Sequence, residues 1–390
     1  WLKPFGLKKG RAAPPRDEAH GAPSHRGMRF SVLSYNVLHG FGASRLLRGR
    51  PGGGAHAAWA RERPRKAAEL VRRLDPDVAC LQEVDAAGRA ALDEALGEDF
   101  VCAGAMGNEE LAPKDGCATF VRRSRFDVLE TQQFRLRDAA QTHFPACETI
   151  RAQAGGMAAA LWRELHEKLT LAVALRLRPR ACSAAEEGGD STKTELCVAT
   201  SHLYWDPRYP DLKLLQAFLL ARELEAFSGP CPLVLAGDLN STPSVGEAGG
   251  GVVGGGTAAF SESGVYALLT RGSVPLGHPH HPVTLRPKRG ILSGVSPGDV
   301  PELVVEPFLS AYREVHGVEG PITNAARGFK GCLDYILYRA GGGAAPLRLR
   351  SVRPLPSEEE LLSQLPLPSP EHPSDHLPIL ADFELGPFAG

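Results

Sequence analysis

Short apolar runs that read as β-strands recur along this chain, and several of them end in a polar side chain. Uncharged runs of four to eight residues bounded by turn residues are typical of buried strands. A polar residue at the end of such a run lies where the chain leaves the core. The predicted strands cover residues 30–38, 78–81, 117–121, 169–177, 196–202, 233–238, 332–338, 347–352 and 377–385.

The run LVLAGDLNSTPS at residues 233–244 is the clearest example of this pattern. Its first half is apolar and uncharged, and Gly237 then leaves room around the backbone. Asp238 and Asn240 follow two residues apart, so an extended backbone directs both side chains to the same face. Pro243 stops the strand. Taken alone, the segment also fits an ordinary Asx turn at a strand exit.

Segments with apolar residues at helical spacing separate many of these strands. They predict helices over residues 59–74, 85–96 and 211–227, and shorter ones over 265–269 and 307–315. Strands and helices alternate, but several strands follow one another through hairpin-like links. This order favours a layered α/β sandwich with mixed sheets over a barrel.

The remaining segments define the expected organisation of the chain. Residues 1–28 are basic and rich in Pro and Gly, which predicts a mobile arm. A catalytic domain is expected over residues 29–386, with a flexible Gly-rich insert at 245–262 and a tail at 387–390. Residues 40–56 and 271–301 favour loops, residues 131–166 are ambiguous, and 354–370 form a Pro-rich linker with a short acidic helix start.

Composition narrows the class of protein. The chain has 390 residues, 43% hydrophobic, and a net charge of -1. A protein that held long duplex nucleic acid by charge alone would be more basic. Eight cysteines without a CxxC pair indicate reduced core thiols of an intracellular protein and argue against a zinc cluster. No apolar run reaches 18 residues, so no membrane span is expected. The chain starts at Trp1, which suggests a piece of a longer precursor.

The polar residues at the strand ends form the candidate site. If they converge, four carboxylates would repel one another unless cations neutralise them. Carboxylate and amide oxygens are hard ligands, so Mg²⁺ or Mn²⁺ fits better than zinc. Two histidines add hydrogen-bond donors for phosphate oxygens. The carboxylates, the amides and these histidines together indicate metal-assisted phosphoester hydrolysis. The residues are Asn36, Glu83, His202, Asp238, Asn240, Asp334, Asp375 and His376.

Six motifs appear in a specific order: LSYNVL (33–38), CLQEVD (80–85), SHLYWDP (201–207), LAGDLNSTPS (235–244), GFKGCLDYILY (328–338) and HPSDHLPIL (372–380). Across roughly residues 29–386 the chain resembles the endonuclease/exonuclease/phosphatase superfamily. HLYWDP together with FKGCLDYI resembles its CCR4-type deadenylase branch. The segment PLPSEE at 354–359 is most similar to the 2′,5′-phosphodiesterase (mitochondrial poly(A) exonuclease) members of that branch. The resemblance implies a four-layer α/β sandwich with two mixed β-sheets flanked by helices.

The resemblance also implies a role for each motif residue. Glu83 would be the principal metal ligand, helped by Asn36 and Asp375. Asp238 would position or deprotonate the attacking water, with Asn240 beside it. His202 and His376 would hold the scissile phosphate, and Asp334 would orient His376. Pro207 and Phe329 fall where the branch stacks the terminal adenine, and Asn240 lies near that base or its sugar.

The expected function is a Mg²⁺- or Mn²⁺-dependent phosphodiesterase, a 3′ exoribonuclease that releases 5′-AMP from poly(A) tails or 2′,5′-linked oligoadenylates. The expected partner is the 3′ end of single-stranded RNA or oligoadenylate, with no membrane and no stable protein partner, in the cytoplasm or mitochondria. Two alternatives remain open: a nocturnin-like phosphatase acting on a small nucleotide such as NADP(H), and a catalytically inactive RNA-binding scaffold. The chain departs from the family at the Gly-rich insert and lacks the leucine-rich repeats that precede some CCR4 nucleases.

Overall fold

The fold is taken from a computed structural model of the 390-residue chain. The structure describes residues 27–40, 42–43, 53–107, 115–143, 165, 170–180, 194–245, 261–288, 300, 302–326, 328–343, 345–362, 364–365, 367–369 and 372–386. The predicted arm and tail, and the centre of the Gly-rich insert at 246–260, lie almost wholly outside these residues.

The first β-sheet has six strands and contains both ends of the described chain. Its central pair, β1 and β2, is parallel, and every other pairing in the sheet is antiparallel. In spatial order the strands are β11 (Leu347–Val352), β12 (Ile379–Leu385), β1 (Met28–Asn36), β2 (Val78–Val84), β4 (Gly116–Arg122) and β3 (Phe100–Gly107).

The second sheet repeats this plan with the middle of the chain. Its parallel pair is β7 and β8, again flanked by antiparallel neighbours. The spatial order is β5 (Phe126–Arg135), β6 (Leu171–Pro179), β7 (Leu196–His202), β8 (Leu233–Asp238), β10 (Asp334–Arg339) and β9 (Leu309–Ser310). Each sheet therefore has two adjacent strands whose carboxyl ends lie at the same edge.

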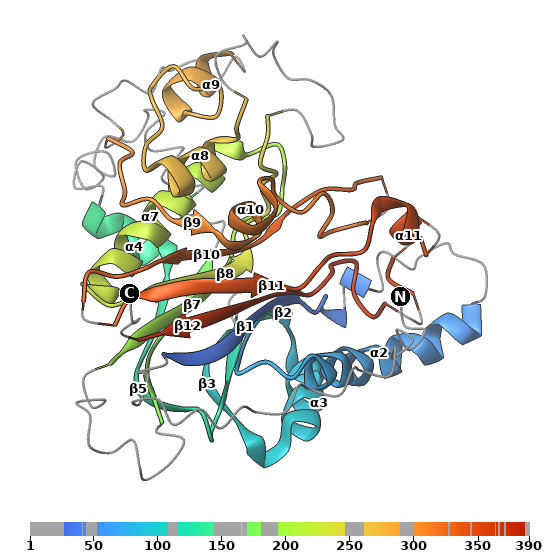
Figure 1. Ribbon diagram of the computed structural model, residues 1–390. Coiled ribbons are helices and arrows are strands. Elements are labelled where there is room, and N and C mark those ends of the chain that lie inside the picture. The colour runs from blue at the N-terminus through green and yellow to red at the C-terminus, as the bar shows by residue number, and fades with distance from the viewer. Residues whose placement is uncertain are drawn as a thin grey trace.

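Helices cover the outer faces of the two sheets (Figure 1). Helices α2 (Gly53–Leu74) and α3 (Ala86–Leu96) lie on the first sheet, while α4 (Leu136–His143), α7 (Pro210–Ser228) and α8 (Gly264–Arg271) lie on the second. The shorter elements are η1 (Gly97–Asp99), α9 (Pro282–Lys288), α10 (Ala311–His316) and α11 (Glu358–Leu362).

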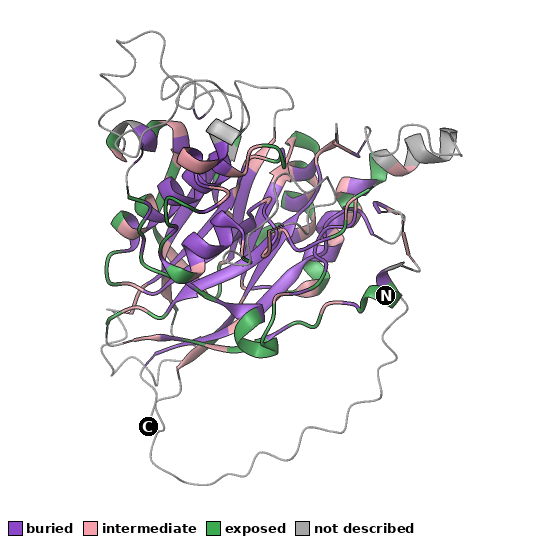
Figure 2. Cartoon of the chain, turned by 90° about the horizontal axis from the view of Figure 1, so that it is seen from above, coloured by how far each residue is buried: buried purple, intermediate pink, exposed green. Residues whose placement is uncertain are grey.

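The core is divided among the resulting layers. One apolar cluster lies under α2 and α3, one lies under α7 and α8, and one fills the space between the sheets, so the central strands are buried on both faces (Figure 2). Two contacts cross between β2 and β7: Gln82 Nε2 donates to Thr200 Oγ1 at 2.9 Å, and Cys80 Sγ lies 3.9 Å from the Ala199 carbonyl oxygen. These layers confirm the predicted four-layer α/β sandwich with two mixed sheets.

The differences from the sequence prediction have physical causes. Strand β5 runs along a sheet edge with a largely exposed surface, so it lacks the apolar run of a buried strand. Helix α2 begins at Gly53, inside the segment predicted as loop, because Ala55, Ala57 and Ala58 favour helix despite the glycines before them. The expected loop at 271–301 contains the short helix α9. Among the helices described, none is long and apolar enough to cross a bilayer.

Candidate active site at the edge of two sheets

The register of the second sheet brings three of the predicted site residues side by side. His202 pairs with Asp238 across the parallel strands β7 and β8, and Asp334 pairs with the same residue across β8 and β10. The backbones of β7 and β8 approach closely just before this point. A Cβ atom on Gly237 would lie 2.3 Å from the Ser201 carbonyl oxygen, so only glycine fits there.

The first sheet supplies the other half of the site. Asn36 ends β1 opposite Gln82 of β2, and an irregularity in the pairing of β2 with β4 follows between Leu81 and Val84. Such a bulge re-aims the side chains next to it. Within it Glu83 has a φ of 54°, a conformation that non-glycine residues seldom adopt and that often occurs at functional sites.

Asn36 connects the two sheets. Its Nδ2 donates to Glu83 Oε1 at 3.0 Å and to Asp238 Oδ2 at 3.0 Å, so one amide spans residues from β2 and β8. Its Oδ1 accepts from the Leu38 amide at 2.9 Å, which fixes the orientation of the side chain. The two halves of the predicted constellation therefore converge at one edge.

Asp238 lies at the centre of the cluster and is 1% exposed. Three nitrogen atoms surround its Oδ2: Asn36 Nδ2 at 3.0 Å, His202 Nε2 at 3.5 Å and His376 Nε2 at 3.6 Å. Its Oδ1 accepts from the backbone amide of Asn240, which has a φ of 47°. Several donors aimed at one small volume suit an anionic group such as phosphate.

Asp334 and His376 form a buried ion pair. His376 Nδ1 lies 2.9 Å from Asp334 Oδ2, which also accepts from Thr323 Oγ1 at 2.6 Å. Burial alone would lower the pKa of His376, but the charges of Asp334 and Asp238 outweigh it and raise that pKa well above its usual value. Burial raises the pKa of Asp334 to about 6, against the opposing charge of His376. The two carboxylates therefore favour the protonated, cationic imidazole.

A divalent cation, which the family resemblance implies, fits the residues at this edge. Asp375 is buried, and among the described residues its Oδ1 has no hydrogen-bond partner. Burial raises the pKa of this carboxyl group. For Glu83, burial also opposes ionisation, but the hydrogen bond from His39 and the nearby His202 lower its pKa instead. A cation would neutralise carboxylates that are costly to bury unpaired.

The residues predicted to bind the base lie around the same edge. Pro207 is exposed in the loop after β7, and Phe329 is partly buried. A Cβ on Gly331 would lie 2.9 Å from the tip of the Phe329 ring and 3.4 Å from the Thr242 methyl group. Asn240 Nδ2 donates to the Leu203 carbonyl at 2.9 Å, so part of its amide is already engaged by the protein.

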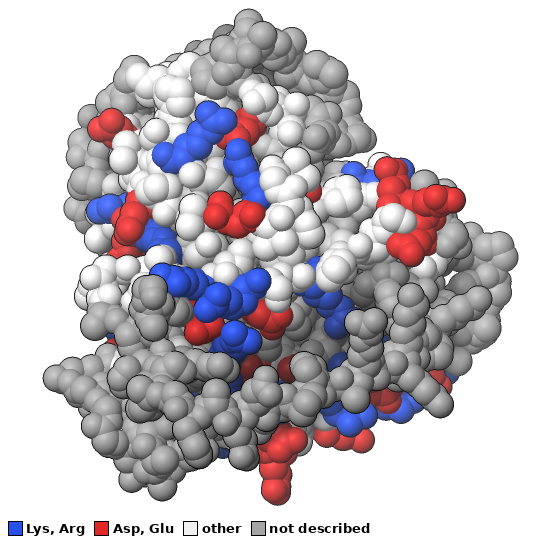
Figure 3. Space-filling view, in the orientation of Figure 1, with Lys and Arg blue, Asp and Glu red and all other residues white. Residues whose placement is uncertain are grey.

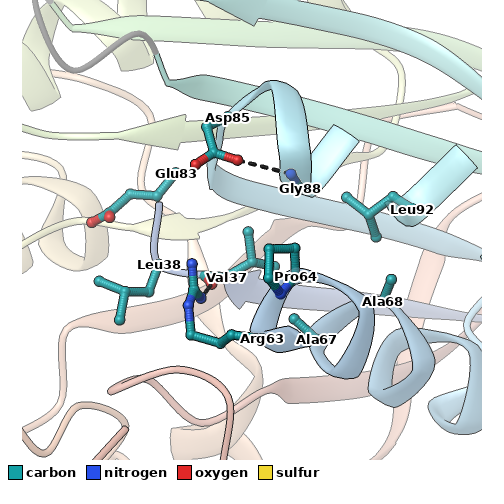
Figure 4. A pocket seen from close by; sticks show the side chains of 10 residues that line it. All are labelled: Val37, Leu38, Arg63, Pro64, Ala67, Ala68, Glu83, Asp85, Gly88 and Leu92. Atoms are coloured by element: carbon teal, nitrogen blue, oxygen red, sulfur yellow. Dashed lines mark hydrogen bonds between the residues drawn. The ribbon is translucent and has the colours of Figure 1, made fainter. Parts of the chain in front are cut away.

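Arg63 of α2 is a site-supporting residue that sequence reasoning missed. It is 2% exposed, and its Nη1 donates to the carbonyl groups of Val37 at 2.5 Å and Pro373 at 3.0 Å. Figure 4 shows it between α2 and the segment that follows β1. It thereby ties together the chain segments that carry Asn36 and Asp375. Its position within a basic helix gave no signal of this role.

Three further residues near the site were also missed. Lys213 of α7 donates from Nζ to the Asn240 carbonyl at 2.5 Å, and burial lowers its pKa to about 8. His39 lies next to Glu83, and its Nδ1 is 3.9 Å from Asp115 Oδ2. Only His39 had a sequence signal, because it follows directly after the motif LSYNVL. The other two depend on how elements pack.

This fold and its acidic, histidine-containing edge define a two-sheet α/β protein with a compact polar site where the sheets meet. The chain belongs to the Endonuclease/Exonuclease/phosphatase family, whose model matches residues 33–376. The motifs also predicted the CCR4-type branch of this family. That prediction is confirmed, because a 2′,5′-phosphodiesterase and a CCR4 homologue are among the curated relatives that match the chain.

Two curated relatives illustrate the similarity. The chain is 30% identical over 318 residues to 2′,5′-phosphodiesterase 12 of Rattus norvegicus, covering 79% of this chain and 43% of the relative. It is 30% identical over 407 residues to Carbon catabolite repressor protein 4 homolog 1 of Arabidopsis thaliana, covering 95% of this chain and 60% of the relative. The chain thus spans about half the length of these proteins.

Solved structures support the fold. The crystal structure of ANGEL2, a 2′,3′-cyclic phosphatase, in complex with adenosine-2′,3′-vanadate superposes with a TM-score of 0.60 and 24% identity, covering 92% of this chain and 96% of that one. The human Nocturnin catalytic domain with bound sulfate superposes with a TM-score of 0.52 and 19% identity, covering 92% and 96%.

Proposed function

We propose that this chain is a divalent-metal-dependent phosphodiesterase whose catalytic unit spans residues 29–386. It removes 5′-AMP from the 3′ end of poly(A) or of 2′,5′-linked oligoadenylate. The names of its relatives, a 2′,5′-phosphodiesterase and CCR4-type exoribonucleases, support this substrate class. Its nuclease or phosphodiesterase character in general follows from the same relatives and the family.

The observation that carries the proposal is the set of donors around Asp238 Oδ2. Asp238 would accept the proton of the attacking water as it adds to phosphorus. His202 and His376 present Nε2 atoms 3.5 and 3.6 Å from this oxygen, where they can donate to phosphate oxygens. Asp334 holds His376 as a cation, which stabilises the charge of the pentavalent state. Breaking the phosphorus–oxygen bond then frees the 3′- or 2′-hydroxyl of the shortened chain.

Glu83, Asn36 and Asp375 would hold the cation, and oxygen donors favour Mg²⁺ or Mn²⁺. A cation bound there offsets the negative charge that develops on the phosphate. Asn36 Oδ1 accepts from the Leu38 amide at 2.9 Å, and its second lone pair would remain for the cation. Asp375 Oδ1 has no hydrogen-bond partner among the described residues, so it too would be available to the cation.

Base recognition is assigned to Phe329 and Pro207, with Asn240 beside the base or its sugar. Stacking on such a platform is worth about 1–3 kcal/mol per base. Phe329 lies against Gly331, and Thr242 lies near the same position, two residues beyond Asn240. The ring thus lies near the segment that follows β8, which supports this assignment. A purine offers the larger stacking face, so adenine is preferred over uracil.

A nucleotide phosphatase acting on a molecule such as NADP(H) is the second candidate. The charge balance favours it: the chain has a net charge of -1, and on the one face that Figure 3 shows, the basic and acidic side chains of the described residues are interspersed. Acidic side chains gather at α11, which contains Glu358, Glu359 and Glu360. A long RNA held through its backbone would require a broad basic surface. A short substrate held at the cluster would not.

Product analysis tests both candidates. Matched 2′,5′- and 3′,5′-linked triadenylates and NADP(H) are incubated with the chain and Mg²⁺, and the products are separated chromatographically. Release of 5′-AMP from either trinucleotide supports the phosphodiesterase. Release of inorganic phosphate from NADP(H), with both trinucleotides left intact, supports the phosphatase. Asp238→Asn should abolish either reaction, whereas Asp127→Asn, at an exposed ion pair with Arg180, should leave it unchanged. No reaction with any substrate would contradict both.

A further inference from the structure

Two side chains, His39 and Asp115, gather beside Glu83 on the side of its Oε2. His39 Nδ1 hydrogen-bonds to Glu83 Oε2, and the backbone amide of His39 donates to the same oxygen at 3.2 Å. The carboxylate of Asp115 approaches from a third segment, with Oδ2 3.9 Å from His39 Nδ1. One ligand atom from each residue lies within 4.8 Å of the others, and the side chains are only 14–16% exposed.

The two oxygens of Glu83 face different surroundings. Oε1 accepts from Asn36 Nδ2 at 3.0 Å and lies 4.0 Å from His202 Nε2, on the side of the phosphate donors. Oε2 faces His39 and Asp115 instead. The ligands that the family resemblance assigns, Asn36 and Asp375 with Glu83, do not include either of these two residues. The second group of donors therefore remains to be explained.

Rigid elements hold this second group in place. His39 follows β1, Glu83 lies in the irregularity of β2, and Asp115 immediately precedes β4, whose Gly116 pairs with Val84. If His39 only neutralised the charge of Glu83, the Asp115 carboxylate beside the same Nδ1 atom would have no purpose. Two carboxylates converging on one imidazole nitrogen form a mixed nitrogen and oxygen ligand set. Imidazole suits transition metals, whereas Mg²⁺ strongly prefers oxygen.

We propose that a divalent transition metal, with Mn²⁺ preferred to Mg²⁺, binds between His39 Nδ1, Glu83 Oε2 and the Asp115 carboxylate. This site shares Glu83 with the cation site of the proposed function. The inference rests on the proposed function only through that shared ligand. A carboxylate whose two oxygens face separate donor groups can serve two neighbouring cations, an arrangement common among phosphoester hydrolases. His39 must give up its hydrogen bond to Glu83 and bind as the neutral imidazole.

Mn²⁺ binding to the full chain, stripped of metal with a chelator, tests the site directly. Mn²⁺ is titrated and its free fraction followed by electron paramagnetic resonance, and pulsed measurements then detect ¹⁴N coupled to the bound ion. Wild-type protein should show one coupled imidazole nitrogen. His39→Ala should lose that coupling and bind Mn²⁺ at least tenfold more weakly, with less than threefold change for Mg²⁺. His316→Ala, at an exposed histidine of α10, should behave as wild type.

Asp115→Asn separates ligation from a general loss of structure. It should weaken Mn²⁺ binding at least tenfold while the ¹⁴N coupling persists, because His39 is still present. His39→Gln provides a variant of similar size whose circular dichroism should match wild type. Absence of ¹⁴N coupling in wild type, or its persistence in His39→Ala, would overturn the proposal. Cleavage of oligoadenylate with Mg²⁺ is scored separately, so failure of this site and failure of the proposed function give different results.

Discussion

Replacing Asp375 by asparagine should abolish the stabilisation of the protein by Mg²⁺. Asp375 is buried; its Oδ2 accepts from Asn324 Nδ2 at 3.4 Å, but its Oδ1 lacks a hydrogen-bond partner among the described residues, so the charge is only partly compensated without a cation. The neutral amide removes that charge with almost no change in volume. The variant without metal should therefore be at least as stable as wild type, while its affinity for the cation falls.

The magnitude follows from linkage between binding and folding. A ligand at 100 times its Kd stabilises the folded state by about 2.7 kcal/mol. In a domain of about 360 residues, each kcal/mol moves Tm by roughly 1.3 °C, which gives a shift of about 3–4 °C for wild type. If the substitution weakens binding about 100-fold, the same Mg²⁺ concentration equals the new Kd. The remaining stabilisation is then about 0.4 kcal/mol, which is less than about 1 °C.

Differential scanning calorimetry in chelator and in Mg²⁺ measures both quantities, with the wild-type Kd first determined by isothermal titration. Asp382→Asn is a matched control, since that carboxylate bonds only to Ser351 Oγ at 2.6 Å among the hydrogen bonds described. It should retain the full wild-type shift. Equal Mg²⁺ shifts in wild type and Asp375→Asn would refute the assignment of Asp375 as a ligand, and no shift in wild type would refute the cation site itself.

Four other substitutions probe separate parts of the site. Asp238→Asn should lower kcat at least 10³-fold in single-turnover assays with an unchanged circular dichroism spectrum, and near wild-type turnover would exclude its role as base. Asp334→Asn should move the basic limb of the pH–rate profile to lower pH, because that carboxylate raises the pKa of His376. A basic limb at the wild-type pH would show that the Asp334–His376 pair does not act in catalysis. The same raised pKa makes the His376 contribution to stability fully present below about pH 6.5 and lost as pH rises through its folded-state value. Arg63→Lys should disturb the hydrogen bonds to the Val37 and Pro373 carbonyls. The free energy of unfolding in urea titrations should fall by about 1–3 kcal/mol, and Mg²⁺ binding should weaken. Arg65→Lys serves as the control, because Arg65 lies in an exposed ion pair. Phe329→Ala should reduce the ratio of kcat/KM for A- over U-terminated trinucleotides about tenfold, or about 1.4 kcal/mol. An unchanged ratio would show that other residues select the base.

The parts of the site that sequence could predict are those fixed by local pattern. Asp238 and Asn240 follow an uncharged strand at a spacing of two, and His202 and Asp334 each lie at an end of an apolar run. Strand register then brings them together, because the ends of adjacent strands share one edge. Glu83 was identified from its motif, but its φ of 54° and the irregularity that turns it toward Asn36 were not apparent in the sequence.

The rest depended on tertiary packing. Strand β3, FVCAGAMG, is rich in small residues and does not alternate, so nothing distinguished it from a loop. Lys213 lies on α7, where burial reaches nearly every side of the helix and removes the usual polar face. Asp115 has no pattern around it, and only the pairing of β4 with β2 places it beside Glu83. Long-range contacts of this kind leave no local signature in one sequence.

The site is divided between two sheets, and this has a consequence for how the protein can change over time. Asn36 and Glu83 belong to one sheet and Asp238 to the other, so their separation is set by the side chains packed between the sheets. Gln82 and Thr200, and Cys80 and Ala199, act as spacers near the catalytic edge. A methyl group gained on one inner face widens the gap unless the opposite face loses one. The two inner faces must therefore evolve as a matched pair, and a hybrid that joins the sheets of two diverged relatives should fold yet hydrolyse its substrate poorly.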